Sequence, residues 1–152
     1  MTALTVTTMD GAAASLIEPG SSRPAERMET IAELKKQGIT CGVHQMPVIP
    51  YLTSGKDSLE AVFSVAKEAG ADYVLTSALS LKGPTRQGFF SSIRQSFPSE
   101  YGRIQALFHD CQAYGAYKQE LQETVRRLRA KYAMPAYVTR REKPAPTQLS
   151  FF

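Results

Sequence analysis

The stretch Gly38–Pro50, GITCGVHQMPVIP, decides the fold class of this chain. It opens on a glycine suited to ending a helix, continues through β-branched and apolar residues, and closes on Pro-Val-Ile-Pro. Helical patterns lie on both sides of it, and an extended apolar run between two helices is typical of a buried parallel strand. We therefore expect Gly38–Pro50 to be a central strand whose C-terminal end leads into a binding loop.

The segments before and after this strand predict an alternation of strands and helices. Residues 3–8 predict a short first strand, and residues 72–81, DYVLTSALSL, predict another buried strand. Apolar stripes at helical spacing predict two main helices between them, which we expect Ser22 and Asp57 to cap. Connections of this length join parallel strands through right-handed crossovers. The sequence thus predicts an α/β fold with three parallel strands, as half of a barrel or as a small open sheet.

The pattern changes after Leu81. A basic loop rich in glycine and proline is followed by a short helix that Pro98 stops and by a second helix capped by Ser99. A turn is expected at Tyr114–Tyr117, and a last helix with a basic outer face over residues 117–132. The chain therefore divides into three predicted parts. They are residues 1–81 with the strands, residues 82–132 as a basic helical extension, and residues 133–152 as a disordered tail rich in proline and arginine.

Composition narrows the class of protein. The 152 residues are 43% hydrophobic and 21% charged, which is ordinary for a globular domain, and no apolar run approaches the roughly 18–20 residues of a membrane span. Two cysteines far apart in the chain predict no disulfide framework, so we expect a cytoplasmic protein. Charge is unevenly placed, with a net −3 over residues 1–81 and +7 over residues 82–152. This asymmetry indicates either a polyanion-binding second half or a solvated basic helix and tail.

Residue patterns predict no catalytic or metal centre within this chain. The pairs Cys41 with His44 and His109 with Cys111 lack the spacing of a zinc or cluster site. There is no nucleophile elbow, no His-Glu-x-x-His and no glycine-rich phosphate loop. Two features at predicted strand ends remain as ligand sites, the hydroxyls of residues 5–8 and the rigid Pro47–Pro50 corner. Threonines that simply favour a strand, and a plain turn, are the competing interpretations.

Four motifs in order carry a resemblance to a known family. They are VTTMD at residues 6–10, LIEPG at residues 16–20, the R-x-x-x-I helix start at residues 27–31, and G-I-x-x-G-V-x-x-x-P-V-I-P at residues 38–50. Over residues 4–132 the chain resembles the second half of the radical S-adenosylmethionine core, in particular spore photoproduct lyase-like, or DNA repair photolyase-like, proteins. The resemblance implies a partial (β/α)6 barrel of which this chain holds the last three strands, and a function in nucleic-acid repair or modification.

The resemblance also implies which residues contact S-adenosylmethionine. Thr7 and Thr8 match the strand end that contacts the ribose, and Arg27 matches a polar residue that can approach the cofactor. Val48 and Ile49 match the strand end that packs near adenine. The family's C-x-x-x-C-x-x-C loop, which holds a [4Fe–4S] cluster, is missing here, so the cluster cannot be bound by this chain alone. We therefore expect a fragment that is inactive without an N-terminal half.

The sequence predicts one class of partner for the basic half of the chain and another for its tail. Cationic side chains after residue 81 are predicted to contact nucleic-acid phosphates, namely Lys82, Arg86, Arg94, Arg126, Arg127 and Arg129. The terminal QLSFF resembles the peptide that attaches bacterial replication and repair proteins to the sliding clamp, with Gln148, Leu149, Phe151 and Phe152 as its anchors. The alternative to an enzyme portion is thus a non-catalytic module that binds DNA or a sliding clamp.

Overall fold

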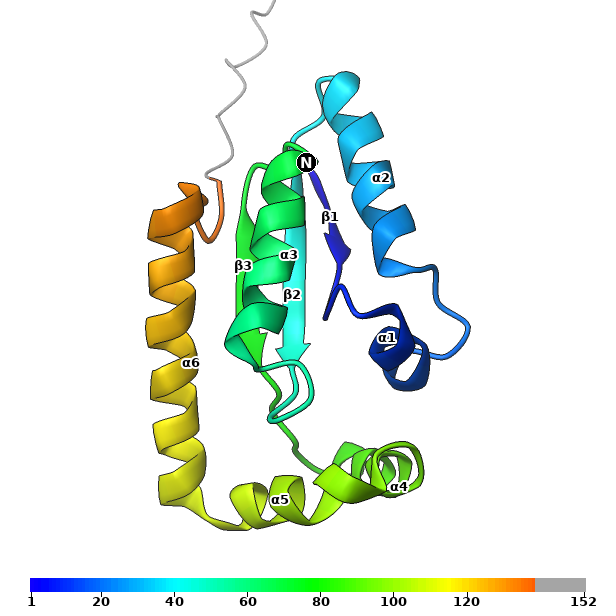
Figure 1. Cartoon of the computed structure of the whole chain (residues 1–152), viewed down its shortest axis with the longest axis vertical. Coiled ribbons are helices and arrows are strands. Elements are labelled where there is room, and N and C mark those ends of the chain that lie inside the picture. Colours follow the sequence, from blue (N-terminus) through cyan, green and yellow to red (C-terminus); the bar gives the residue numbers. More distant parts are fainter. Residues whose placement is uncertain (139–152) are drawn as a thin grey trace, which may run out of the picture.

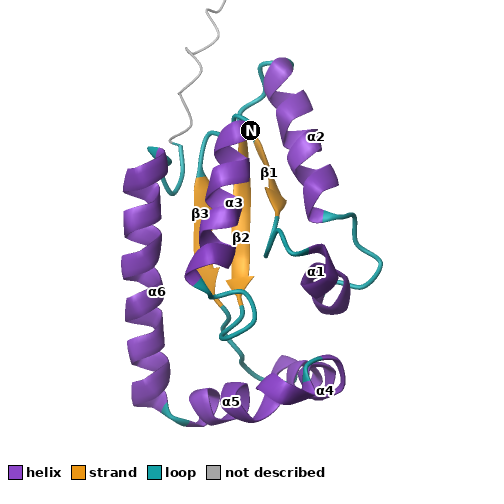
Figure 2. Ribbon diagram, viewed as in Figure 1, coloured by secondary structure: helices purple, strands orange, loops and turns teal. Residues whose placement is uncertain are grey.

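A three-stranded parallel sheet with helices beside it forms the centre of the structure, a computed structural model that describes residues 1–138 (Figures 1 and 2). Strands and helices alternate in the first half, and three helices follow the last strand. In chain order the elements are β1 (Thr2–Thr5), α1 (Gly11–Ile17), α2 (Pro24–Lys36), β2 (Cys41–Val48), α3 (Lys56–Glu68), β3 (Val74–Ala78), α4 (Thr85–Ser96), α5 (Pro98–His109) and α6 (Cys111–Tyr132). The predicted α/β class with three parallel strands is confirmed.

The strands lie in sequence order, with β2 between β1 and β3. Thr2 is in register with Cys41 on one side of β2, and Val43 with Val74 on the other. The pairing with β3 becomes irregular between Gln45 and Val48, next to the cis peptide bond that precedes Pro47. The stretch that decides the fold is therefore the middle strand, and its last residues leave the regular ladder.

One face of the sheet packs against helices. Cys41 and Val43 of β2 lie in the same buried cluster as Ile31 of α2 and Phe63 of α3. Gln45 points to this side as well, because its Nε2 donates to the Leu59 carbonyl at 3.5 Å. Side chains alternate along a strand, so α2 and α3 cover the same face.

The opposite face turns away from α2 and α3. It carries Gly42, His44 and Met46 of β2, together with Tyr73, which precedes β3. The Tyr73 ring lies against Gly42 so closely that a Cβ added there would be 2.2 Å from ring atoms, and its hydroxyl is 3.3 Å from His44 Nε2. Gly42 is therefore needed because an aromatic ring occupies the place of a side chain.

The helices correct several sequence-based expectations. The turn expected at Tyr114–Tyr117 is wrong, because α6 runs without interruption from Cys111, with Asp110 Oδ1 accepting from the amides of Gln112 and Ala113 at 2.9 and 3.0 Å. The expected capping residues Ser22, Asp57 and Ser99 are also wrong, since the capping positions are Arg23, Gly55 and Phe97. Proline in the first turn sets the start of α2 and of α5, so the capping position lies one residue after Ser22 in α2 and two residues before Ser99 in α5.

The three C-terminal helices lie below the sheet and beside it. Figure 1 shows α4 and α5 below the C-terminal ends of β2 and β3, and α6 beside the outer edge of β3. Leu121, Val125 and Leu128 of α6 join the main core, whereas Ile93 and Ile104 form a second cluster with Ile49. Among the described residues, no helix combines the length and apolarity that crossing a bilayer requires.

Candidate functional site

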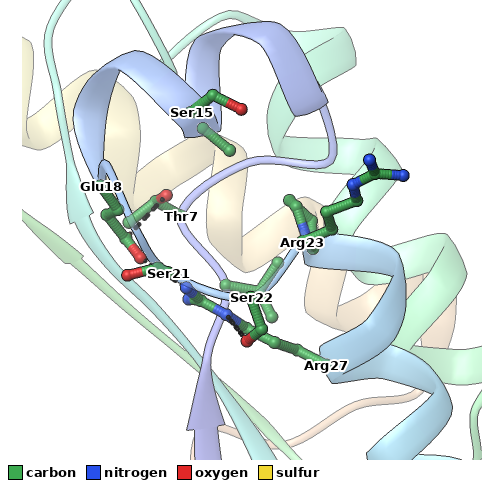
Figure 3. A pocket seen from close by; sticks show the side chains of 10 residues that line it. Thr7, Ser15, Glu18, Ser21, Ser22, Arg23 and Arg27 are labelled. Atoms are coloured by element: carbon green, nitrogen blue, oxygen red, sulfur yellow. Dashed lines mark hydrogen bonds and ion pairs between the residues drawn. The ribbon is translucent and has the colours of Figure 1, made fainter.

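A polar network lies at the C-terminal end of β1, where Thr7 meets α1 and α2 (Figure 3). Glu18 is its centre, since one carboxylate oxygen accepts from Thr7 Oγ1 at 3.2 Å and the other accepts from Arg27 Nη2 at 2.8 Å. Arg27 also donates to the Thr5 carbonyl at 2.6 Å and to Ser22 Oγ at 3.1 Å. The structure thus brings together two of the predicted cofactor residues, Thr7 and Arg27, through a carboxylate that the prediction did not include.

Arg27 also covers part of the outer edge of β1. Val6 donates its amide to the His44 carbonyl, so its neighbour Thr5 directs its backbone groups away from β2. The guanidinium of Arg27 therefore caps an outward-facing carbonyl of an edge strand. The outer edge of β1 is therefore closed at this point by a charged side chain.

The remaining predicted cofactor residues lie apart from this network. Thr8 is buried and its hydroxyl is 3.3 Å from Ser58 Oγ at the start of α3. Val48 is completely buried in the main core. Ile49 lies in the second cluster, against Leu79 and Ile93. The five residues therefore surround the end of the sheet without converging on one point.

Two cavities, one polar and one apolar, share Glu18 as a lining residue. The first has a volume of about 20 Å³, is lined by Thr7 and Arg27, and has room for about one water molecule. Figure 3 shows the Arg23 side chain, also part of its lining, pointing away from the network. The second has a volume of about 250 Å³ and is mostly apolar, with Pro47 and Ile49 on one side. Its other walls come from Leu16, Ile17, Leu79, Phe89, Ser92, Ile93 and Phe97.

The six predicted nucleic-acid residues divide into three groups. Lys82, Arg126 and Arg129 line a hollow of about 790 Å³ between β3 and α6. Arg86 and Arg94 line another, of about 480 Å³, on α4 and α5. Arg127 lines neither hollow and pairs with Glu123 at 2.9 Å.

Sequence reasoning missed two residues, Glu18 at the polar network and Lys118 in the β3–α6 hollow. Glu18 was passed over because it stands in a Pro-Gly turn, although an acidic residue near a strand end was a usable signal. Lys118 lines the β3–α6 hollow, and it was missed although the predicted helix over residues 117–132 includes it. Helical spacing within that predicted helix already places Lys118 on the same face as Leu121 and Val125, and this was a usable signal.

The cysteines do not fit an iron–sulfur cluster. A [4Fe–4S] cluster requires several thiolates close together. Cys41 is buried in the sheet and Cys111 is exposed at the start of α6, and burial raises the pKa of the Cys41 thiol, assisted by the nearby Asp72 carboxylate. Within residues 1–138, no group of three or more histidine, cysteine or acidic residues is placed to hold a metal ion. The clamp-type peptide Gln148–Phe152 lies outside the described residues.

Comparisons with known proteins find relatives but no family. The chain is 29% identical over 133 residues to uncharacterized protein Rv2578c of Mycobacterium tuberculosis strain H37Rv and, to the same extent, to uncharacterized protein Mb2609c of Mycobacterium bovis. These alignments cover 87% of this chain and 38% of each relative, so the chain spans less than half the length of these curated relatives. No protein-family profile matches, and no solved structure matches.

Proposed function

We propose that this chain is the C-terminal part of a radical S-adenosylmethionine-type protein and binds that cofactor at the C-terminal end of its sheet. The observation that carries the proposal is the position of Glu18, which borders both the Thr7–Arg27 network and the apolar cavity beside Ile49. A nucleoside needs both kinds of surface, an apolar one for its base and a polar one for its ribose. The C-terminal ends of parallel strands are where ligands of such folds bind.

The sheet supports the finer assignment to a partial (β/α)6 barrel. The strands follow one another in sequence order, and α2 and α3 lie on one face. An open doubly wound sheet has helices on both faces, whereas a barrel keeps its helices outside and its other face inside. In this proposal the face with His44 and Met46 is the barrel interior, and an N-terminal half supplies the missing strands and the cluster-binding cysteines.

The residues have separate roles in holding the cofactor. Pro47, Ile49 and Phe89 form an apolar surface for the adenine ring. Glu18 has spare capacity, because its carboxylate accepts two hydrogen bonds from protein groups and can accept about four. Arg27 fixes the position of that carboxylate, so Glu18 is able to accept from ribose hydroxyls. The cofactor is a radical source only beside a reduced cluster, and no step of that reaction is assigned to this chain.

The whole protein is proposed to act on nucleic acid in repair or modification, in the cytoplasm. The alternative is a non-catalytic module that binds DNA, or a sliding clamp through Gln148–Phe152. The cationic hollows on α4 and α6 favour DNA within that alternative. The two candidates separate experimentally, since only the first requires a nucleoside at Glu18.

An NMR titration of the 152-residue chain with S-adenosylhomocysteine tests the cofactor site. We expect amide shifts at Glu18, Ile49 and Phe89, and an affinity roughly tenfold weaker in Glu18→Gln, because the variant loses a charged acceptor. Glu33→Gln is the matched control, since it removes the same charge from an exposed position on α2. Absence of shifts, or equal weakening by both variants, would contradict the proposal.

A further inference from the structure

The outer edge of β3 is only partly covered. Val74 donates its amide to the Pro135 carbonyl at 3.0 Å, and Arg129 Nη2 lies 3.5 Å from the Val74 carbonyl. Alternate residues of a parallel strand direct their backbone groups to the same side, so Thr76 and Ala78 also face this edge. Both line the hollow of about 790 Å³ that separates β3 from α6. Beyond Val74, the strand edge therefore offers backbone donors to whatever enters the hollow.

The charged lining of this hollow is entirely cationic. None of the described residues that line it is acidic, and its charged members are Lys82, Lys118, Arg126 and Arg129. Arg126 pairs with Glu123 at 2.7 Å, but within residues 1–138 the other three form no ion pair. Four cations around one hollow repel each other, and an anion relieves that repulsion.

Arg129 adds a donor that the protein does not satisfy. Its Nε is buried and has no hydrogen-bond partner in the described structure, and burial lowers the pKa of its guanidinium. Buried donors are almost always paired in folded proteins. The hydroxyls of Ser77 and Ser80 and the amide of Gln122 lie around the same hollow. This combination of guanidinium, ammonium, hydroxyl and backbone N–H groups is the donor set that binds phosphate oxygens.

A second hollow adjoins the first. Lys82 lines the β3–α6 hollow, and the next residue, Gly83, lines the hollow of about 480 Å³ on α4 and α5. There Arg86 lies 5.3 Å from the Phe90 ring centroid, and Arg94 lies 5.7 Å from that of Tyr101. Cations beside aromatic rings are typical of surfaces on which unpaired bases stack. Two adjoining hollows of this kind fit an extended chain of phosphates with accessible bases better than a single phosphate ion.

We propose that the β3–α6 hollow and the α4–α5 hollow together form a track for single-stranded nucleic acid. Phosphates bind at Lys82, Lys118 and Arg129, and bases reach Phe90 and Tyr101. The inference takes from the proposed function only that nucleic acid is the ligand class, and it names the strand form and the contacts. It does not depend on the cofactor site at Glu18, whose two cavities share no lining residue with either hollow.

Fluorescence anisotropy with a labelled thymidine oligonucleotide tests this track on the full chain. The variant Lys82→Gln/Lys118→Gln removes two exposed phosphate contacts. We expect its affinity to fall roughly tenfold near physiological salt, and the slope of log affinity against log salt to become shallower by about 1.4. The control Lys36→Gln/Lys67→Gln removes the same charge from exposed positions on α2 and α3, and it should bind almost as well as the wild type.

Three results would overturn the proposal. They are no binding of the oligonucleotide, equal loss in the two double variants, and a duplex of the same length binding as tightly as the single strand. Pyrophosphate is tested as a third ligand, after the single strand and the duplex. If pyrophosphate binds and the oligonucleotide does not, the hollow is a site for a small anion instead. The S-adenosylhomocysteine titration on the same preparation separates this failure from failure of the proposed cofactor site.

Discussion

A partly buried arginine lies on each flank of the sheet, and the two differ in whether the protein satisfies their hydrogen-bond donors. Beside β1, Arg27 is 14% exposed, and Glu18, Thr5 and Ser22 accept its hydrogen bonds next to a cavity of only about 20 Å³. Beside β3, Arg129 borders a hollow of about 790 Å³ and its Nε has no partner among the described residues. A cation whose donors the protein satisfies contributes to the fold, whereas one left with a free donor in an open hollow is available to a ligand.

The largest expected effect comes from breaking the satisfied side. Arg27→Met leaves the Glu18 carboxylate and the Thr5 carbonyl without their cation. We expect a loss of about 2–3 kcal/mol in the free energy of unfolding, because a partly buried charge is left unpaired. Urea denaturation followed by circular dichroism measures it.

The matched variant on the other flank is Arg126→Met. Its side chain is 77% exposed and its ion pair with Glu123 spans one helical turn. Such a pair contributes little, so the urea midpoint should not change measurably. Equal destabilisation by the two variants would remove the distinction between the flanks.

A smaller effect is expected at alkaline pH. It concerns the hydrogen bond that joins α6 to β2. Tyr117 donates to the Val48 carbonyl at 3.4 Å, and burial raises the pKa of its phenol above the ordinary value of 10.0. A raised pKa means that the neutral form is favoured in the folded state. Its contribution is therefore complete below about pH 10 and is lost as the pH rises toward the folded-state pKa.

The measurement compares wild type with Tyr117→Phe between about pH 8 and about pH 11. We expect the urea midpoint of the wild type to fall more steeply above about pH 10 than that of the variant. Tyr73 and Tyr114, whose phenol pKa values are also raised by burial, are present in both proteins and provide the common background. Parallel curves would show that Tyr117 has no part in the alkaline loss.

The smallest expected effect is on nucleic-acid affinity, when the acidic partner of two cations on the β3 flank is removed. Glu123 accepts hydrogen bonds from both Arg126 and Arg127, at 2.7 and 2.9 Å. Glu123→Gln releases these two cations and should raise the affinity for a single-stranded oligonucleotide about two- to threefold. Glu33→Gln, which releases Lys36 on the far side of the molecule, should leave that affinity unchanged. A fall in affinity with Glu123→Gln would argue against phosphate contacts on this face of α6.

Local sequence patterns were sufficient for the order of elements and for the parallel sheet. Gly38 adopts positive φ after α2, as the pattern predicted, and Gly70 does the same after α3. Tyr114–Tyr117 misled, because Gly115 in an aromatic surrounding suggests a turn, yet Asp110 starts a helix whose packing against the core outweighs one glycine. Tertiary contact decided the outcome where local preference was weak.

The candidate site was predictable only in part, for a related reason. The proximity of Thr7 and Arg27 follows from the geometry of a strand and the next helix. That both contacts pass through Glu18 depends on how the Pro19–Gly20 turn folds back, which periodicity does not encode. Likewise, the basic residues of α6 were evident in the sequence, but which of them face β3 depends on the packing of that helix.

Gly42 has a consequence for whatever packs against the sheet face that turns away from α2 and α3. Because the buried Tyr73 ring occupies the space above this glycine, an aromatic ring next to the imidazole of His44 takes the place of an aliphatic side chain on this face. A layer that covers it must match this relief, with a shallow group over the ring and a hydrogen-bonding group near the imidazole. One missing side chain therefore determines the shape of the sheet face that lies opposite the main core.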